Sequence, residues 1–284
     1  AEISGFKITN GFVPNYQRGG GIELEIVGEI LLSNLQIVNN EAYYGGGISV
    51  EGFGWEWNGQ VHITLDHVEI TNNYARSNGG GYIASGDLVS TLFKSVTVAN
   101  NIAEGSGGGI ISGIGNYAVL ANSILWNNSP DDVYGAVFPH YSNLNGGIGG
   151  EGNITIDPLF MDSTDFHLQE ESPCIDAGSA LVIINLDSLM LPGEDWMGDT
   201  IVNVNPAFYG GNAPDMGAYE SPFTGPYSGP VWHVSTTGSD STGDGSEENP
   251  FASIQFGLDS TNDEDTVLVA SGMYVEHIIW PPTS

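Results

Sequence analysis

The chain repeats one short apolar segment five times, and this repeat constrains its fold more than any other feature. Each segment alternates apolar and polar residues and ends in an asparagine; the five asparagines are Asn10, Asn39, Asn72, Asn100 and Asn127. They are separated by 29, 33, 28 and 27 residues. Three-glycine runs recur in step, before apolar segments that begin at Ile22, Ile48, Tyr82 and Ile110. Two markers with a common period indicate one structural unit repeated along the chain.

Each period has room for about three short strands. Ile22, Leu24 and Ile26 alternate with Glu23 and Glu25, which is the period of a half-buried strand. Coils built from such strands would stack about 4.8 Å apart and bury their apolar faces against one another. We therefore expect the five asparagines to lie one above another and to form a hydrogen-bonded ladder with a structural role.

The recurring apolar-x-apolar-x-Asn-Asn and Gly-Gly-Gly-Ile elements of residues 1–130 resemble those of right-handed parallel β-helix proteins of the pectate-lyase-like group. The resemblance implies an all-β solenoid with about three short strands per coil. It does not imply one activity, because the group includes lyases, hydrolases, adhesins and structural proteins.

The remaining sequence divides into three parts after the coils of residues 1–152. Residues 153–220 look like the segment that closes secreted bacterial β-helix proteins, and Cys174 within it is interpreted as a small buried residue. Residues 221–230 are rich in glycine and proline and are predicted to be a linker. Residues 231–284 resemble the cap and first coil that begin such a β-helix. There we expect strands at 231–235, 266–270 and 273–280, and one short helix that follows an N-cap at Asn249.

A closing segment that precedes an opening cap is an unusual order. Three explanations remain open: the chain is one window of a tandem array, it is a permutant, or the cap of one copy covers the first coil of the next. The last arrangement is a head-to-tail contact, which forms a filament unless it closes into a ring. An uncovered coil would be an exposed sheet edge, which favours some such cover.

The charge balance restricts the partners. The chain has 4 Lys and Arg against 35 Asp and Glu, a formal net charge of −31. Such a surface repels phosphate, so nucleic acid and anionic membranes are excluded as partners. Membrane insertion is not expected either, since no apolar run approaches roughly 18 residues. The resemblance to secreted proteins implies a secreted or cell-surface location.

The candidate ligand-binding residues are aromatic. A glycine-rich insertion at 52–59 carries Phe53, Trp55 and Trp57, and neighbouring turns carry Tyr43, Tyr44, Tyr74 and Arg76. Exposed rings on a rigid ladder would stack on the sugar rings of a polysaccharide. The alternative is that these rings fold over the coil and bury their area there. Arg76 aligns with Glu104 of the next coil, and we expect these two to pair.

The only cofactor that the sequence suggests is calcium. The loop 239–248 holds four carboxylates, and hard oxygen ligands on a glycine-rich loop suit this ion: Asp240, Asp244, Glu247 and Glu248. The spacing matches no EF-hand, and the alternative is a loop that is simply solvated.

These patterns predict a secreted or cell-surface β-helix with a structural or binding role, in a head-to-tail filament or a tandem array. The alternative is a polysaccharide lyase or glycoside hydrolase. The sequence offers two candidate groups for such an activity, Asp131–Asp132 and the stretch that holds His62, Asp66, His67 and Glu69. The shortage of basic residues, and of any column of acidic residues on successive coils, argues against an enzyme.

Overall fold

The computed structural model describes residues 1–26, 28–53, 61–185, 197–223, 230–261 and 265–279. The chain forms two compact units, Ala1–Gly225 and Pro226–Ser284. Each is described by itself below. The predicted linker at 221–230 lies partly outside the described residues.

In its described residues, the first unit consists of strands and one 3-10 turn, η3 (Pro206–Phe208). Its strands, in chain order, are β1 (Glu2–Ser4), β2 (Lys7–Thr9), β3 (Ile22–Ile26), β4 (Gly28–Val38), β5 (Glu41–Ala42), β6 (Ile48–Phe53), β7 (Val61–Thr71), β8 (Tyr74–Ala75), β9 (Tyr82–Asp87), β10 (Val89–Ala99), β11 (Ile102–Ala103), β12 (Ile110–Ser112), β13 (Tyr117–Ala121), β14 (Ile124–Trp126), β15 (Val133–Gly135), β16 (Val137–His140), β17 (Asn143–Leu144), β18 (Leu181–Asn185) and β19 (Met197–Asn203).

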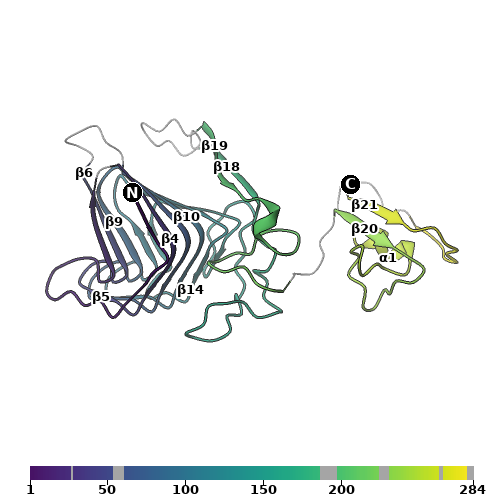
Figure 1. Ribbon diagram of the computed structural model, residues 1–284, viewed down its shortest axis with the longest axis horizontal. Coiled ribbons are helices and arrows are strands. Elements are labelled where there is room, and N and C mark those ends of the chain that lie inside the picture. Colours follow the sequence, from purple (N-terminus) through teal and green to yellow (C-terminus); the bar gives the residue numbers. More distant parts are fainter. Residues whose placement is uncertain (27, 54–60, 186–196, 224–229, 262–264, 280–284) are drawn as a thin grey trace. The chain divides into compact units, whose positions relative to one another are not determined.

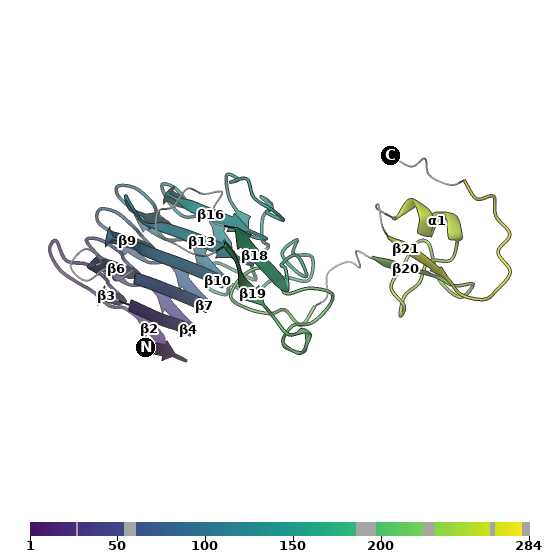
Figure 2. The ribbon, with the colours of Figure 1, turned by 90° about the horizontal axis from the view of Figure 1, so that it is seen from above.

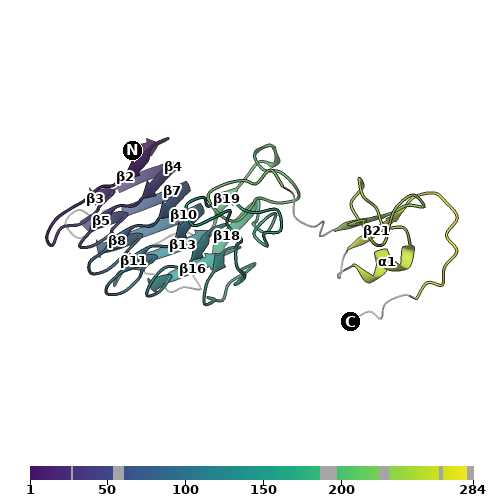
Figure 3. The same ribbon diagram turned by 90° about the horizontal axis from the view of Figure 1, so that it is seen from below.

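Three parallel sheets run along this unit, because every coil returns to lie beside the one before it. The first sheet has the order β1-β4-β7-β10-β13-β16, with β2 beside β4 and β14 beside β10. The second has the order β3-β6-β9-β12-β15 and the third β5-β8-β11. The stacked coils are seen edge on in Figure 2, and the short third sheet is labelled in Figure 3. The predicted fold class, an all-β parallel β-helix, is confirmed.

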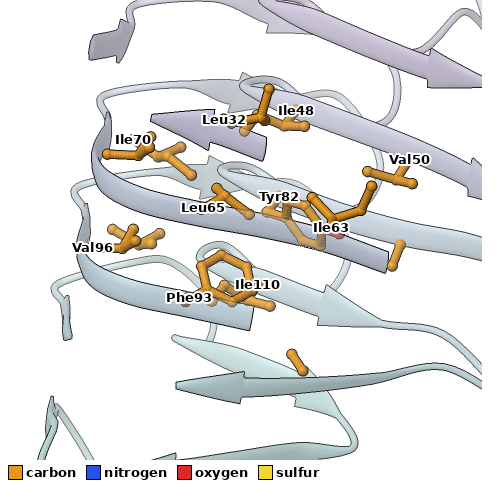
Figure 4. Packing of buried hydrophobic residues seen from close by; sticks show 14 of the residues in the cluster. Leu32, Ile48, Val50, Ile63, Leu65, Ile70, Tyr82, Phe93, Val96 and Ile110 are labelled. Carbon is orange, nitrogen blue, oxygen red and sulfur yellow. The ribbon is translucent and has the colours of Figure 1, made fainter. Parts of the chain in front are cut away.

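The core fills the inside of the coils. Ile37 lies beside Ile70, and Ile70 beside Val98, and all three side chains are fully buried. Figure 4 shows how residues from successive strands continue this core, among them Ile63, Leu65 and Phe93. Since each coil buries the apolar face of its neighbour, the core grows by one layer per repeat.

The closing segment covers the first sheet from outside. Strands β18 and β19 form an antiparallel pair, labelled in Figure 1. Their Val182 and Val202 pack with Tyr117 and Val119 of β13. Residues 215–221 then cross the same sheet. The Gly217 amide donates to the Asn122 carbonyl, and the Ala218 amide donates to Thr97 Oγ1 at 2.9 Å. The segment therefore runs back along the stack, from the coil of β14 toward that of β4.

Cys174 lies beneath this cover. It is fully buried, which confirms its interpretation as a core residue. Burial raises the pKa of its thiol to about 12. A thiol with so high a pKa is protonated at neutral pH and is a poor nucleophile.

The second unit contains β20 (Val231–Val234), α1 (Ile254–Asp259) and β21 (Thr266–Val269), and the two strands are parallel. The single short helix is confirmed, but its expected N-cap at Asn249 is wrong. Ser253 is the N-cap and accepts from the Phe256 amide, whereas Asn249 donates to the Thr242 carbonyl and holds the loop. The expected strand at 273–280 is also wrong, since residues 273–279 form none. No helix in the described part of the chain is long and apolar enough to cross a membrane.

Candidate functional site

The five repeat asparagines lie at the turns between strands, one on each coil. All five have positive φ, between 56° and 58°, which asparagine tolerates better than most residues. Their backbones are in register, since the Asn39 amide donates to the Thr71 carbonyl and the Asn72 amide to the Ala99 carbonyl. Among these five side chains one mutual hydrogen bond is present, from Asn127 Nδ2 to Asn100 Oδ1 at 2.8 Å.

In the four repeats after the first, the residue that follows this asparagine forms a continuous ladder, which is buried at its first three members and half-buried at the fourth. Its members are Asn40, Asn73, Asn101 and Asn128. Asn73 Oδ1 accepts from both the backbone amide and Nδ2 of Asn40, at 2.9 and 3.0 Å. Asn101 Oδ1 accepts the same pair of bonds from Asn73. Because the ladder satisfies turn amides that water cannot reach, its role is structural.

Asp132 ends the ladder. Its Oδ1 accepts from the amide and Nδ2 of Asn128, at 3.0 and 2.7 Å. Burial, only partly offset by these bonds, raises the pKa of Asp132 to about 6. The Asp131–Asp132 pair weighed as an acid–base group therefore includes a carboxylate that is already used by the fold.

The third sheet carries an exposed aromatic face. Its short strands turn two adjacent columns of side chains outward, on either side of the buried Ala42, Ala75 and Ala103. One column contains Phe12, Glu41, Tyr74 and Ile102, and the other contains Tyr43, Arg76 and Glu104. We use "aromatic face" for Phe12, Tyr16, Tyr43, Tyr44 and Tyr74, together with Arg18 and Arg76.

Three rings of this face contact one another at their edges, and Tyr16 and Phe12 are exposed whereas Tyr43, Tyr44 and Tyr74 are half-buried. Tyr43 lies between Tyr16 and Tyr44, with ring centres 4.7 and 4.8 Å away and planes inclined at 62° and 79°. Tyr16 is 78% exposed and Phe12 is 57% exposed. Other rings of the chain are as exposed, such as Phe208 at 76%, so what distinguishes Tyr16 and Phe12 is that they lie beside further aromatic side chains.

Both arginines of the face lie above aromatic rings. The Arg76 guanidinium is 5.2 Å from the centre of the Phe12 ring, and that of Arg18 is 5.7 Å from the centre of Tyr44. Such cation–π contacts hold the rings in place.

Carboxylates neutralise both arginines. Arg76 Nε donates to Glu41 Oε1 at 2.8 Å, and Arg18 lies 3.1 Å from Glu51. The expected Arg76–Glu104 pair is therefore wrong: Arg76 turns to the preceding coil, and Glu104 accepts from the Tyr74 hydroxyl. That hydrogen bond raises the pKa of Tyr74 above its ordinary value.

The structure brings Tyr43, Tyr44, Tyr74 and Arg76 together, as residues of one face. Phe53 ends β6, and its side chain, with all of Trp55 and Trp57, lies outside the described residues. Phe12 and Tyr16 also belong to this face but were not predicted from the sequence. The repeat contained the signal for Phe12, which follows Asn10 by two positions as Tyr74 follows Asn72.

The four acidic residues proposed for calcium have separate surroundings. Asp240 Oδ1 accepts from the amides of Ala252 and Ser253 at 2.7 and 3.0 Å, and Asp244 Oδ1 accepts from the Ser246 amide. Glu247 and Glu248 are exposed. Partial burial raises the pKa of Asp240, but the hydrogen bonds from Ser253 and Ala252 outweigh it and lower the value overall. Within the described residues, no three His, Cys, Asp or Glu side chains form a group that could hold a metal ion.

The stretch from His62 to Glu69 does not form one site. His62 Nδ1 lies 2.6 Å from Ser90 Oγ, and Asp66 pairs with His67 at 2.7 Å and with Lys94 at 3.1 Å. Glu69 is buried under the closing segment.

The fold places this chain among parallel β-helix proteins in architecture. No protein-family model, no curated protein and no solved structure matches it.

Proposed function

We propose that this chain is an extracellular β-helix that binds a polysaccharide through its aromatic face. The observation that carries the proposal is the exposure of Phe12, which lies in one column of the third sheet, and of Tyr16, which lies in a turn and packs its ring against Tyr43. Sugar rings have apolar C–H faces that pack against exposed aromatic rings, and a tyrosine adds a hydroxyl for polar contact. We also propose, from the repeat pattern, a relationship to the pectate-lyase-like group.

The fold supports this role because it orders the rings before a ligand arrives. The strands beneath the face are hydrogen-bonded from coil to coil, for example from the Tyr74 amide to the Asn40 carbonyl at 2.9 Å. Tyr43 is held by rings on both sides, and Arg76 is held by Glu41. A preorganised surface loses less conformational entropy on binding.

The charges favour a neutral polysaccharide over a polyanionic one. The two arginines of the face are each paired with a glutamate, so they offer no free positive charge to a uronate. The net charge of −31 also repels polyanions at long range.

The test is binding to a panel of neutral and uronate-containing polysaccharides, followed by affinity electrophoresis with variants. We expect retention by at least one neutral polysaccharide, and a roughly tenfold weaker affinity for Tyr16→Ala, since loss of one stacked ring is worth about 1.4 kcal/mol. Tyr134→Ala is the control, because Tyr134 is also exposed, at 57%, but lies on β15 of the second sheet.

Two outcomes would reject the proposal. One is that no polysaccharide is retained, and the other is that Tyr134→Ala weakens retention as much as Tyr16→Ala. Appearance of unsaturated or reducing products during the incubation would instead support the alternative, a polysaccharide lyase or glycoside hydrolase.

A further inference from the structure

The stack of coils ends in a hollow beside the asparagine ladder. Strand β17 still pairs with β14, but the loop 145–153 that follows it, all of which the structure describes, forms no further strand. The Gly147 amide donates to the Leu144 carbonyl, and the loop returns to β17, where Ile154 bridges to Asn143. Because this loop is shorter than a full coil, it leaves a cavity of about 320 Å³ beside the preceding coil.

Acidic and apolar side chains line this cavity. Asp132 reaches it from the end of the ladder and is only 8% exposed, whereas the neighbouring Asp131 is exposed. These two are the only charged residues of the lining, which otherwise consists of asparagine, glycine, proline and apolar residues, among them Leu144 and Ile148. A cavity of this size accommodates a small organic group.

The carboxylate of Asp132 is buried without a positive partner. It forms no ion pair among the described residues, and the charge that acts on it, that of Asp131, has the same sign. Its hydrogen bonds come from neutral groups, namely the amide and Nδ2 of Asn128 and the backbone of Asn145. With a pKa of about 6, it is ionised at neutral pH. Since a buried charge is costly unless it is paired, a cation in the cavity would stabilise this site.

The ladder itself does not require this charge. One coil earlier, Asn128 Oδ1 accepts from the amide and Nδ2 of Asn101, both at 2.9 Å. Asn101 Oδ1 accepts the same pair of bonds from Asn73. A neutral amide is thus a sufficient acceptor at each earlier position. What the carboxylate of Asp132 adds is a negative charge at the wall of the cavity.

The lining favours a compact ammonium group as the cation. A guanidinium binds a carboxylate best through two parallel bonds, but Asp132 Oδ1 already accepts two bonds from Asn128. A quaternary ammonium is held by aromatic rings, and none is among the described residues of the lining. Calcium takes six to eight oxygen ligands, and the described residues hold no group of three acidic or histidine side chains. A primary ammonium has three donors on one atom, which suits the two carboxylates and the Asn145 amide oxygen.

We propose that this cavity binds a primary ammonium group on an apolar stem, with the ammonium at Asp131 and Asp132 and the stem against Leu144 and Ile148. A lysine side chain of a partner and a small alkylamine share this chemistry. The cavity contains no residue of the aromatic face, so the proposal is independent of polysaccharide binding.

The test is isothermal titration calorimetry of the full chain with butylammonium at constant ionic strength and about pH 7.5, where Asp132 is ionised. We expect one saturable site with a dissociation constant on the order of 1 mM. Asp132→Asn should weaken binding at least about tenfold, because it removes the buried charge. This variant keeps an acceptor for Asn128 and should fold, which circular dichroism confirms.

Two further variants complete the comparison. Asp131→Asn changes an exposed side chain outside the ladder and should weaken binding about threefold, as expected for a solvated ion pair. The matched control is Glu170→Gln, which removes a carboxylate at an exposed position outside the cavity and should bind like wild type.

The affinity should also fall with pH. Protonation of Asp132 removes the charge that holds the ammonium, whereas the amine, with a pKa of about 10, keeps its proton. Since the pKa of Asp132 is about 6, lowering the pH from about 7.5 to about 5 should weaken binding about tenfold. In Asp132→Asn this part of the pH dependence should be absent.

Further titrations identify the source of the ammonium and compare other cations. Binding of N-acetyl-lysine amide at least as tightly as butylammonium would indicate a lysine side chain of a partner, and binding of butylammonium alone would indicate a free alkylamine. Ethylguanidinium and calcium should both bind more weakly than butylammonium. The proposal would be overturned by absence of saturable binding, by tighter binding of ethylguanidinium or calcium, by a folded Asp132→Asn that binds like wild type, or by an equal loss in Glu170→Gln.

Discussion

The Tyr219 hydroxyl donates a hydrogen bond to Glu69 Oε2 although 150 residues separate them in the sequence. Glu69 is only 5% exposed, and its carboxylate also accepts from Thr71 Oγ1 at 2.7 Å and from Gln36 Nε2 at 3.2 Å. The bond ties the closing segment to the outside of the first sheet. A buried carboxylate is thus stabilised by donors from two coils and from the segment that covers them.

The first prediction removes this bond. Tyr219→Phe leaves Glu69 buried with one donor fewer, and the expected loss is about 1–3 kcal/mol in the free energy of unfolding. Urea unfolding followed by fluorescence measures it. Tyr16→Phe, which changes an exposed ring, should stay within about 0.5 kcal/mol of wild type. An equal loss in both variants would argue against a specific role for the Tyr219 hydroxyl.

The second prediction concerns pH. Burial, with the charge of Asp176 adding to it, raises the pKa of Asp215 to about 6, and burial with the charge of Asp215 raises that of Glu220 to about 7. A raised carboxyl pKa means that the folded state binds the proton more tightly than the unfolded state, whose pKa is about 4. Stability should therefore rise as pH falls from about 7.5 to about 5, and the gain is complete below the unfolded value.

Glu220→Gln tests the origin of this dependence. Because the variant removes one ionisable group, its stability curve between pH 5 and 7.5 should be flatter than that of wild type. At pH 7.5 the variant should be more stable, on the order of 1 kcal/mol, since the cost of ionising a partly buried carboxylate is gone. Thermal melts in buffers of equal ionic strength give the comparison. A variant curve parallel to wild type would show that other groups cause the dependence.

The third prediction compares the two sets of asparagines, the repeat asparagines with positive φ and the ladder of asparagines that follow them in the sequence. Asn73→Ala leaves the amide of Asn40 and Asn40 Nδ2 without their shared acceptor, Asn73 Oδ1, in a fully buried place. We expect a loss of about 2–4 kcal/mol in unfolding free energy from these orphaned donors. Asn72→Gly should be nearly neutral, because Asn72 has a φ of 57°, which glycine adopts without strain. Equal losses from the two variants would contradict the structural role assigned to the ladder of Asn40, Asn73, Asn101 and Asn128.

These two columns also show what sequence alone determines and what it leaves open. The period of the asparagine doublets was enough to predict stacked parallel coils. It did not decide which asparagine of each doublet points inward, because that depends on the backbone at the turn: the first takes positive φ and the second faces the core. Periodicity places residues on a coil, whereas a side-chain direction at a turn depends on dihedral angles.

Two other features, the hairpin strand β18 and the partner of Arg76, were not predicted, because the sequence there does not distinguish the alternatives. The hairpin strand β18 alternates buried Val182 and Ile184 with exposed Leu181 and Ile183, all of them apolar, so the period of two is hidden. On the aromatic face, Arg76 has a glutamate on each neighbouring coil, Glu41 and Glu104. The alignment of successive coils in the sequence favours neither glutamate as the partner of Arg76. In the structure Glu104 accepts a hydrogen bond from the Tyr74 hydroxyl, and Arg76 pairs with Glu41.

The last prediction concerns salt and calcium. With a net charge of −31 and few ion pairs among the described residues, repulsion between carboxylates should destabilise the folded chain at low ionic strength. Raising NaCl from about 0.02 to 0.5 M shortens the screening length from roughly 20 Å to about 4 Å, so the melting temperature should rise. The measurement uses dilute protein, which keeps association between copies small.

Calcium and magnesium, compared at equal ionic strength, decide whether the acidic loop binds an ion specifically. Asp240 already accepts from two amides, and no described group of three acidic or histidine side chains converges there. Both divalent ions should therefore raise the melting temperature equally, by screening. A larger rise with calcium, abolished by Asp244→Asn, would show a calcium site on the loop, because calcium prefers several flexible oxygen ligands whereas magnesium retains its water.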